Sequence, residues 1–152
     1  MTRMPTVPES EARKAWMGLL ARAAPCLLRD LLPVDAPPHS LLRPPEVGAV
    51  MVRGRIGATG APFNLGEVTV TRCAVRLATG QVGHAHVQGR DKDHALRSAL
   101  VDAMMQTEAA PALQRDVLAE LARAEQETKT IRAGKAAATR VEFFTMVRGE
   151  DQ

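Results

Sequence analysis

The chain has 152 residues, a length that fits one domain, and its 45% hydrophobic and 24% charged residues are typical of a globular protein. A formal net charge of +3 suits anionic ligands or an acidic partner. Nucleic acid is a weaker interpretation, because one Trp, three Phe and no Tyr leave few rings on which bases could stack. No signal segment and no apolar run of about 18 residues is evident, so we expect a cytoplasmic protein with no membrane contact.

The first third of the chain predicts two helices and a connecting segment. We expect residues 1–8 to be a disordered tail and residues 9–150 to form a single domain. Apolar residues at helical spacing predict a helix over 9–23, and a shorter helix over 26–32 follows Pro25. The Pro37-Pro38 and Pro44-Pro45 pairs predict an extended connection. Cys26 and Cys73 form no motif and are interpreted as small buried apolar residues.

The middle of the chain predicts three strands and a helix. Strands are expected over 46–56, 66–77 and 82–88, with a loop at 57–62, residues 63–66 leading into the second strand, and a turn at 78–81. The loop 57–62 is interpreted as a hairpin connection rather than a phosphate-binding loop, since no Gly-Lys-Ser/Thr follows it. Asp91 is expected to cap a helix that runs to about residue 106, whose unusually apolar surface predicts more enclosure than a surface helix has, with contacts to both the sheet and a partner.

The second strand changes its alternation. Val68 and Val70 share one face, whereas Cys73, Val75 and Leu77 share the opposite one. A regular strand cannot place both sets in one core. We therefore predict either a β-bulge near residues 71–72 or a strand that is buried on both faces.

The last third predicts a long helix and a final strand. A helix over 112–133 is expected to begin at Pro111 and end at Gly134, with its polar second half either solvated or lying on another protein. Alternation over 139–149 predicts a last strand. The predicted fold class is α+β, with a mainly antiparallel sheet of about four strands packed with helices.

Two groups of residues are candidate binding sites. His84 and His86 share a strand face and His94 follows in the next helix, and imidazole nitrogens of this kind can bind a metal. No Asp, Glu or Cys completes a ligand set, so we predict no metal site. Arg90, Asp91 and His94 surround a helix start, where free N–H groups favour phosphate or phosphonate. Ordinary capping by Asp91 explains the same pattern, and Arg90 is also a candidate for a contact with another subunit.

No catalytic residue is predicted. No Ser, Cys or carboxylate lies in a nucleophile–base pattern, so an independent active site is not supported and no cofactor is expected. The apolar Phe144 and Met146 in the predicted last strand are candidates for contact with a partner.

Three separated blocks of the sequence resemble one protein family. They are GEVTVTRCAVRL at 66–77, VQGRDKDHA at 87–95 and VEFFTMVRG at 141–149, and AWM at 15–17 and GATG at 57–60 add to them. The blocks are similar to the G subunit of the bacterial carbon–phosphorus (C–P) lyase system. The resemblance extends over about residues 9–150 and is weakest in the proline-rich segment 33–45.

The resemblance implies an accessory role in phosphonate catabolism. The family is a small subunit of a core complex with the H, I and J subunits, and the L subunit joins transiently. The complex displaces adenine from ATP with an alkylphosphonate, giving ribose 1-methylphosphonate 5-triphosphate. No catalytic residue of the G subunit carries over. The first hypothesis is therefore a non-catalytic scaffolding subunit of this transferase, the alternative is a phosphate- or phosphonate-binding module at 90–94, and a histidine metalloenzyme is the third.

Overall fold

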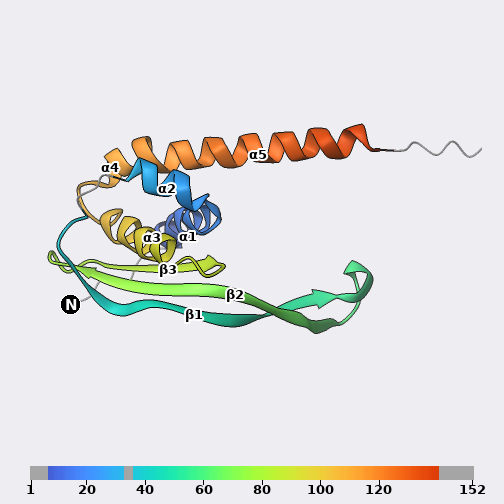
Figure 1. Cartoon of the computed structure of the whole chain (residues 1–152), viewed down its shortest axis with the longest axis horizontal. Coiled ribbons are helices and arrows are strands. Elements are labelled where there is room, and N and C mark those ends of the chain that lie inside the picture. The colour runs from blue at the N-terminus through green and yellow to red at the C-terminus, as the bar shows by residue number, and fades with distance from the viewer. Residues whose placement is uncertain (1–6, 33–35, 141–152) are drawn as a thin grey trace, which may run out of the picture.

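The computed structural model describes residues 7–32 and 36–140 and has an α+β fold, as predicted. The described helices gather on one side of the strands, with α3 nearest to them and α5 farthest away (Figure 1). Short 3-10 and π-helical turns lie at Ile56–Ala58 and Gln114–Leu118. The remaining elements are α1 (Val7–Arg22), α2 (Pro25–Leu31), β1 (His39–Arg55), β2 (Pro62–Leu77), β3 (Val82–Gln88), α3 (Lys92–Met104), α4 (Ala110–Leu113) and α5 (Ala119–Ala138).

The described strands form one antiparallel sheet in the order β1-β2-β3. It has three strands rather than about four, and the predicted last strand at 139–149 lies, from residue 141 on, outside the described residues. The hairpin predicted around 57–62 is confirmed, because β1 pairs with β2 from Arg55↔Pro62 down to His39↔Leu77. α1 begins at Val7, two residues before the predicted start.

β1 is longer than predicted. It begins at His39 rather than at residue 46 and runs through Pro44-Pro45, which were expected to connect and not to pair. The pairing slips between Leu41 and Arg43 and again between Arg43 and Glu46. Proline lacks the N–H that a ladder needs, but an edge strand with irregular pairing tolerates it. The prolines therefore interrupt the ladder without ending the strand.

β2 is buried on both faces where its alternation changes. Its pairing with β3 is continuous from Val70 to Arg76, so the predicted bulge at residues 71–72 is wrong and the extra residues opposite this stretch belong to β1. The other predicted alternative is correct, since Val70 and Thr71 point to opposite faces and both are buried. The Thr71 hydroxyl donates a hydrogen bond to the Gly89 carbonyl over 2.7 Å, which satisfies this polar group inside the core.

α3 packs very closely on the sheet. The core between them contains small residues of the helix and apolar residues of β2 and β3: Cys73, Val75, Leu77, Ala85, Val87, Ala95, Ala99, Leu100 and Ala103. Gly83 makes the closest approach, because a Cβ built on it would lie 1.9 Å from the Ala99 carbonyl oxygen and 2.6 Å from the Ala103 nitrogen. The small residues Gly83 and Ala85 on this face of β3 are what let the helix approach so closely.

A second core lies on the other side of α3. There Val101 packs with residues of α1, α2 and the start of the last helical segment: Leu20, Leu28, Leu113, Val117, Leu118 and Leu121. α3 is enclosed between the two cores, as predicted, but its second contact is with helices of the same chain and not with a partner. Cys73 is buried but Cys26 is exposed on α2, so its predicted burial is wrong. The short α2 buries Leu28 alone, and Cys26 lies on its outward side.

α5 continues past its predicted end. Gly134 was expected to terminate it, but the helix runs to Ala138. A glycine inside a helix costs only about 1 kcal/mol relative to alanine. The following Lys135-Ala136-Ala137-Ala138 run consists of strong helix formers, which offset that cost.

A buried carboxylate joins α1, α3 and β3. Asp102 of α3 is fully buried and its two oxygens accept four hydrogen bonds, from Arg13 Nε (3.1 Å) and Nη2 (2.7 Å), from the Trp16 indole (2.9 Å) and from the backbone N–H of His84 (2.9 Å). Arg13 and Gln106 also donate to the Val82 carbonyl. Two polar groups on the outer edge of β3, the Val82 carbonyl and the His84 N–H, are thereby satisfied by side chains instead of another strand.

We expect Gly83→Ala to destabilise the fold by more than about 3 kcal/mol, because the new methyl group overlaps backbone atoms of α3 that cannot move without separating helix and sheet. Urea denaturation followed by circular dichroism measures the loss. Gly66→Ala is the matched control, since a Cβ at that position meets nothing within 4 Å. Equal stability of the two variants would show that the close packing is not needed.

We expect Asp102→Asn to lower the free energy of unfolding by about 3–5 kcal/mol, because one amide oxygen cannot accept the four hydrogen bonds of the buried carboxylate and Arg13, whose side chain is 34% exposed, loses its charged partner. Asp116→Asn is the control. Asp116 pairs with Arg115 on the surface, and losing an exposed pair of this kind changes stability little. A small effect of Asp102→Asn in the same denaturation assay would contradict the prediction.

Candidate functional site

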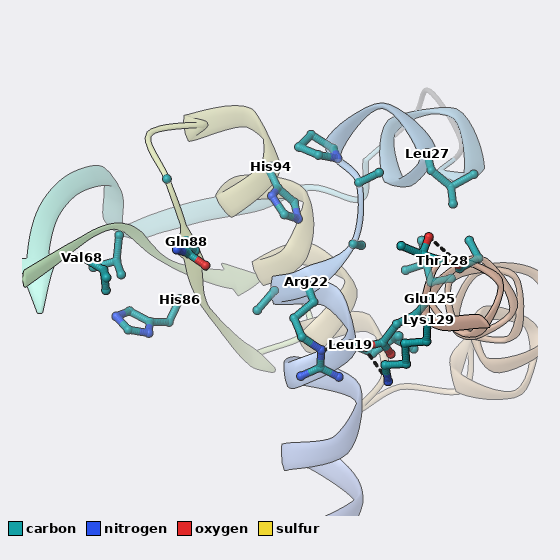
Figure 2. A pocket seen from close by; sticks show the side chains of 18 of the residues that line it. Leu19, Arg22, Leu27, Val68, His86, Gln88, His94, Glu125, Thr128 and Lys129 are labelled. Carbon is teal, nitrogen blue, oxygen red and sulfur yellow. Dashed lines mark hydrogen bonds and ion pairs between the residues drawn. The ribbon is translucent and has the colours of Figure 1, made fainter. Parts of the chain in front are cut away.

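An open cleft lies between the sheet and the helices. It has a volume of about 1100 Å³. Valines of β1 and β2 and the polar end of β3 form one side, and residues of α1, α2 and α5 form the other. Figure 2 shows Val68, His86 and Gln88 on the sheet side, with Leu19 and Arg22 of α1 and with Glu125, Thr128 and Lys129 of α5 across from them.

The helical side of the cleft carries more positive than negative charge. Glu125 accepts from Arg22 Nε over 2.8 Å and from Lys129 Nζ over 3.1 Å, which links α1 to α5. The hydrogen bond from Arg22, and then that from Lys129, holds the pKa of Glu125 below its ordinary value. Arg132 also lines the cleft and makes no ion pair with any described residue. Three cations therefore face one carboxylate.

Two projecting segments border this cleft. The first, called the hairpin arm, is residues 49–69, the part of β1 and β2 that extends beyond β3. The second, the helical arm, is residues 122–140 of α5 and its end. Both run in the same direction away from the core (Figure 1). The hairpin arm exposes Met51, Ile56, Phe63 and Leu65, and the helical arm exposes Ile131, with none of its residues buried. Exposed apolar side chains gathered on such projections are typical of protein-binding surfaces.

The three candidate histidines are not brought together as ligands. His94 is buried, and its Nε2 lies 2.8 Å from the Leu20 carbonyl oxygen, so that nitrogen carries the proton and donates. His84 and His86 are exposed on the outer face of β3. Among residues 7–32 and 36–140, no group of three His, Cys, Asp or Glu side chains could hold a metal ion.

The helix start at 90–94 is a capped turn with an exposed arginine. The Asp91 carboxylate accepts from the His94 N–H over 2.9 Å, which is the predicted cap. Gly89 has a φ of 97°, a conformation that glycine adopts without strain. Arg90 is exposed and pairs with no described residue. Ligand or subunit contact at Arg90, Asp91 and His94 stays a prediction, and Phe144 and Met146 lie outside the described residues.

The predictions from sequence missed Asp102. Its signal was present, because a carboxylate that interrupts the apolar run Ala99-Leu100-Val101-Asp102-Ala103 needs a buried partner. The position of Arg13, 89 residues away, could not be inferred from that run. The buried Cys73 is not a candidate nucleophile, because burial raises the pKa of its thiol and the thiol stays protonated at neutral pH.

The fold and its surfaces define a class: a small α+β protein with two projecting arms, whose exposed apolar side chains are suited to protein partners. Within this class, residues 11–149 match the model of the family described as phosphonate metabolism protein PhnG. The chain is also 49% identical over 146 residues to the α-D-ribose 1-methylphosphonate 5-triphosphate synthase subunit PhnG of Rhizobium meliloti (strain 1021), covering 91% of this chain and 90% of that protein. The chain belongs to the PhnG family, which confirms the resemblance read from its three blocks.

The same relative is named as one subunit of a synthase. No helix in the described part of the chain has the length and apolar character needed to cross a membrane. The family match extends over the residues of both arms.

We expect the Glu125 contacts to make stability depend on pH in a defined direction. A depressed pKa means that the contacts contribute fully above the ordinary value of 4.5 and that this contribution is lost as the pH falls through the lowered folded-state value. Glu125→Gln should cost about 0.5 kcal/mol at pH 7, since the partners are partly exposed, and much less below the folded-state pKa. Thermal melts of both proteins across this range measure it; a difference that is constant with pH would contradict it.

Proposed function

We propose that this chain is a non-catalytic scaffolding subunit of the C–P lyase core complex. In this role it supports the transfer of an alkylphosphonate onto the ribose of ATP with release of adenine. Family membership and the name of the Rhizobium relative support a place in such a synthase. The observation that carries the scaffolding role is the pair of arms, whose apolar residues contact little of their own chain.

The chemistry of the arms indicates the kind of partner surface. Ile56 and Leu65 at the end of the hairpin arm are 74% and 66% exposed, so burying them against another subunit would remove apolar surface from water. Residues 128–140 of the helical arm contain Lys129, Arg132, Lys135 and Arg140 and no Asp or Glu. A partner with apolar depressions and acidic side chains matches both properties. The proposed partners are the I, J and H subunits, with the L subunit transient.

Catalysis is assigned to the partner subunits. The described residues hold no nucleophile–base pair, and the cleft between the sheet and the helices is open and lined by valines, by the ion-paired Arg22, Glu125 and Lys129, and by Arg132. A scaffolding subunit needs no chemistry of its own, because it acts by holding other subunits in a productive arrangement.

Co-expression with the I subunit and affinity purification test the proposal. The wild-type chain should co-purify with the I subunit, and the double variant Ile56→Glu/Leu65→Glu should reduce recovery at least tenfold, because two charges would be buried at the contact. Its circular dichroism should stay unchanged, since both side chains are exposed.

The control for this experiment is Ala112→Glu/Ala119→Glu, which adds the same charges at exposed positions away from both arms. This variant should co-purify like the wild type. A wild-type chain that remains monomeric in the presence of every proposed partner would overturn the scaffolding role, and equal recovery of both double variants would overturn the part assigned to the hairpin arm.

A further inference from the structure

The outer face of the sheet, the one turned away from α3, gathers basic side chains in adjacent rows. Residues directly opposite one another in antiparallel strands share a face. The pairing sets Arg43 of β1, Ala74 of β2 and His84 of β3 in one row. The next row consists of Glu46, Arg72 and His86, and Arg76 follows on the other side of Ala74. Five side chains that carry or can gain positive charge thus surround one small alanine.

These side chains lack acceptors within the described structure. The Nε of Arg72 is buried and has no hydrogen-bond partner, and the side chains of Arg43 and Arg76 make no ion pair with a described residue. Other arginines of the chain are paired, for example Arg13 with Asp102 and Arg97 with Asp93. A guanidinium stays protonated in proteins, and leaving a buried donor of this kind without an acceptor destabilises the fold.

The one carboxylate in these rows does not neutralise Arg72. Glu46 is its direct cross-strand neighbour, yet no ion pair within 4.0 Å forms between them. The Arg72 guanidinium lies over β1 instead, where Nη2 would be 3.2 Å from a Cβ built on Gly48. The missing side chain of Gly48 therefore leaves space for Arg72 to lie along the sheet surface.

A hollow opens where these rows meet. It has a volume of about 480 Å³, and its lining includes Arg43, Arg72, His84 and His86, with Ala74 paired between Arg43 and His84. It lies on the outer face and is separate from the helix start at 90–94. Among the described residues, three arginines and one glutamate give this region a net charge of +2 when both histidines are neutral.

We propose that this hollow binds a phosphate-type oxyanion, free or as part of a larger molecule. A carboxylate presents two oxygens in one plane and is satisfied by a single guanidinium. A tetrahedral dianion presents three oxygens, which suits donors that approach from three strands. Its charge of about −2 balances the positive charge of the site. The Nε–H of Arg72 supplies the buried donor, Arg43 closes one side, and His84 and His86 border the other.

The experiment is a calorimetric titration of the full chain at low ionic strength with sodium tripolyphosphate, inorganic phosphate and citrate as probes. We expect one-to-one binding of tripolyphosphate, weaker binding of phosphate and at least tenfold weaker binding of citrate. Arg72→Gln should weaken tripolyphosphate binding at least tenfold. Arg43→Gln, at an exposed position, should weaken it several-fold and serves if Arg72→Gln does not fold.

The matched control is Arg53→Gln. It removes an unpaired, exposed arginine of β1, the strand that also holds Arg43, but one that lies outside the hollow. It should bind tripolyphosphate like the wild type. Equal loss in Arg53→Gln and Arg72→Gln would overturn the proposal in favour of a diffuse basic surface, and a citrate affinity equal to that of tripolyphosphate would overturn the phosphate assignment. No binding by the wild type would show that solvent alone satisfies Arg72.

Discussion

The buried carboxylate of Asp102 fixes how the two halves of the core meet. It accepts from Arg13 and Trp16 of α1 and from the backbone of β3, so three elements share one pair of oxygens. Placing a charge in the core is costly unless all its lone pairs are used. The orientation of α1 beside β3 therefore follows from where the Asp102 hydrogen bonds can all be made, and the apolar contacts of Leu20 and Leu28 fill the space that this orientation leaves.

The lengths of the strands explain the two-armed shape. β1 and β2 contain 17 and 16 residues, whereas β3 contains 7, so about half of the hairpin extends beyond the region that the helices cover. α5 likewise continues after Leu121, its last buried residue, for about 25 Å at 1.5 Å per residue. A monomer gains little from elements that bury so little surface. The proposed scaffolding role accounts for both arms, because partner subunits would bury the surface that they expose.

The fold class, the hairpin, the capped helix start and the family could be predicted from the sequence, because each depends on neighbouring residues or on a contiguous block. The tight fit of β3 against α3 was also visible, in the small residues Gly83 and Ala85. The predicted end of α5 at Gly134 is wrong, because the alanines after this glycine are strong helix formers and continue the helix to Ala138. The strand through Pro44-Pro45 was missed because its edge position, which makes proline tolerable there, is a property of the sheet.

The sequence by itself determined the local conformations and membership of the PhnG family, since periodicity, capping residues and block order are all written along the chain. The tertiary structure alone decided which distant residues meet. It paired Asp102 with Arg13, turned the His94 ring toward Leu20, and set Arg43, Arg72 and His84 on one face through two slips in the pairing of β1. The physical reason is that burial and strand register depend on the whole packed sheet, and a slip of one residue moves a side chain to the opposite face.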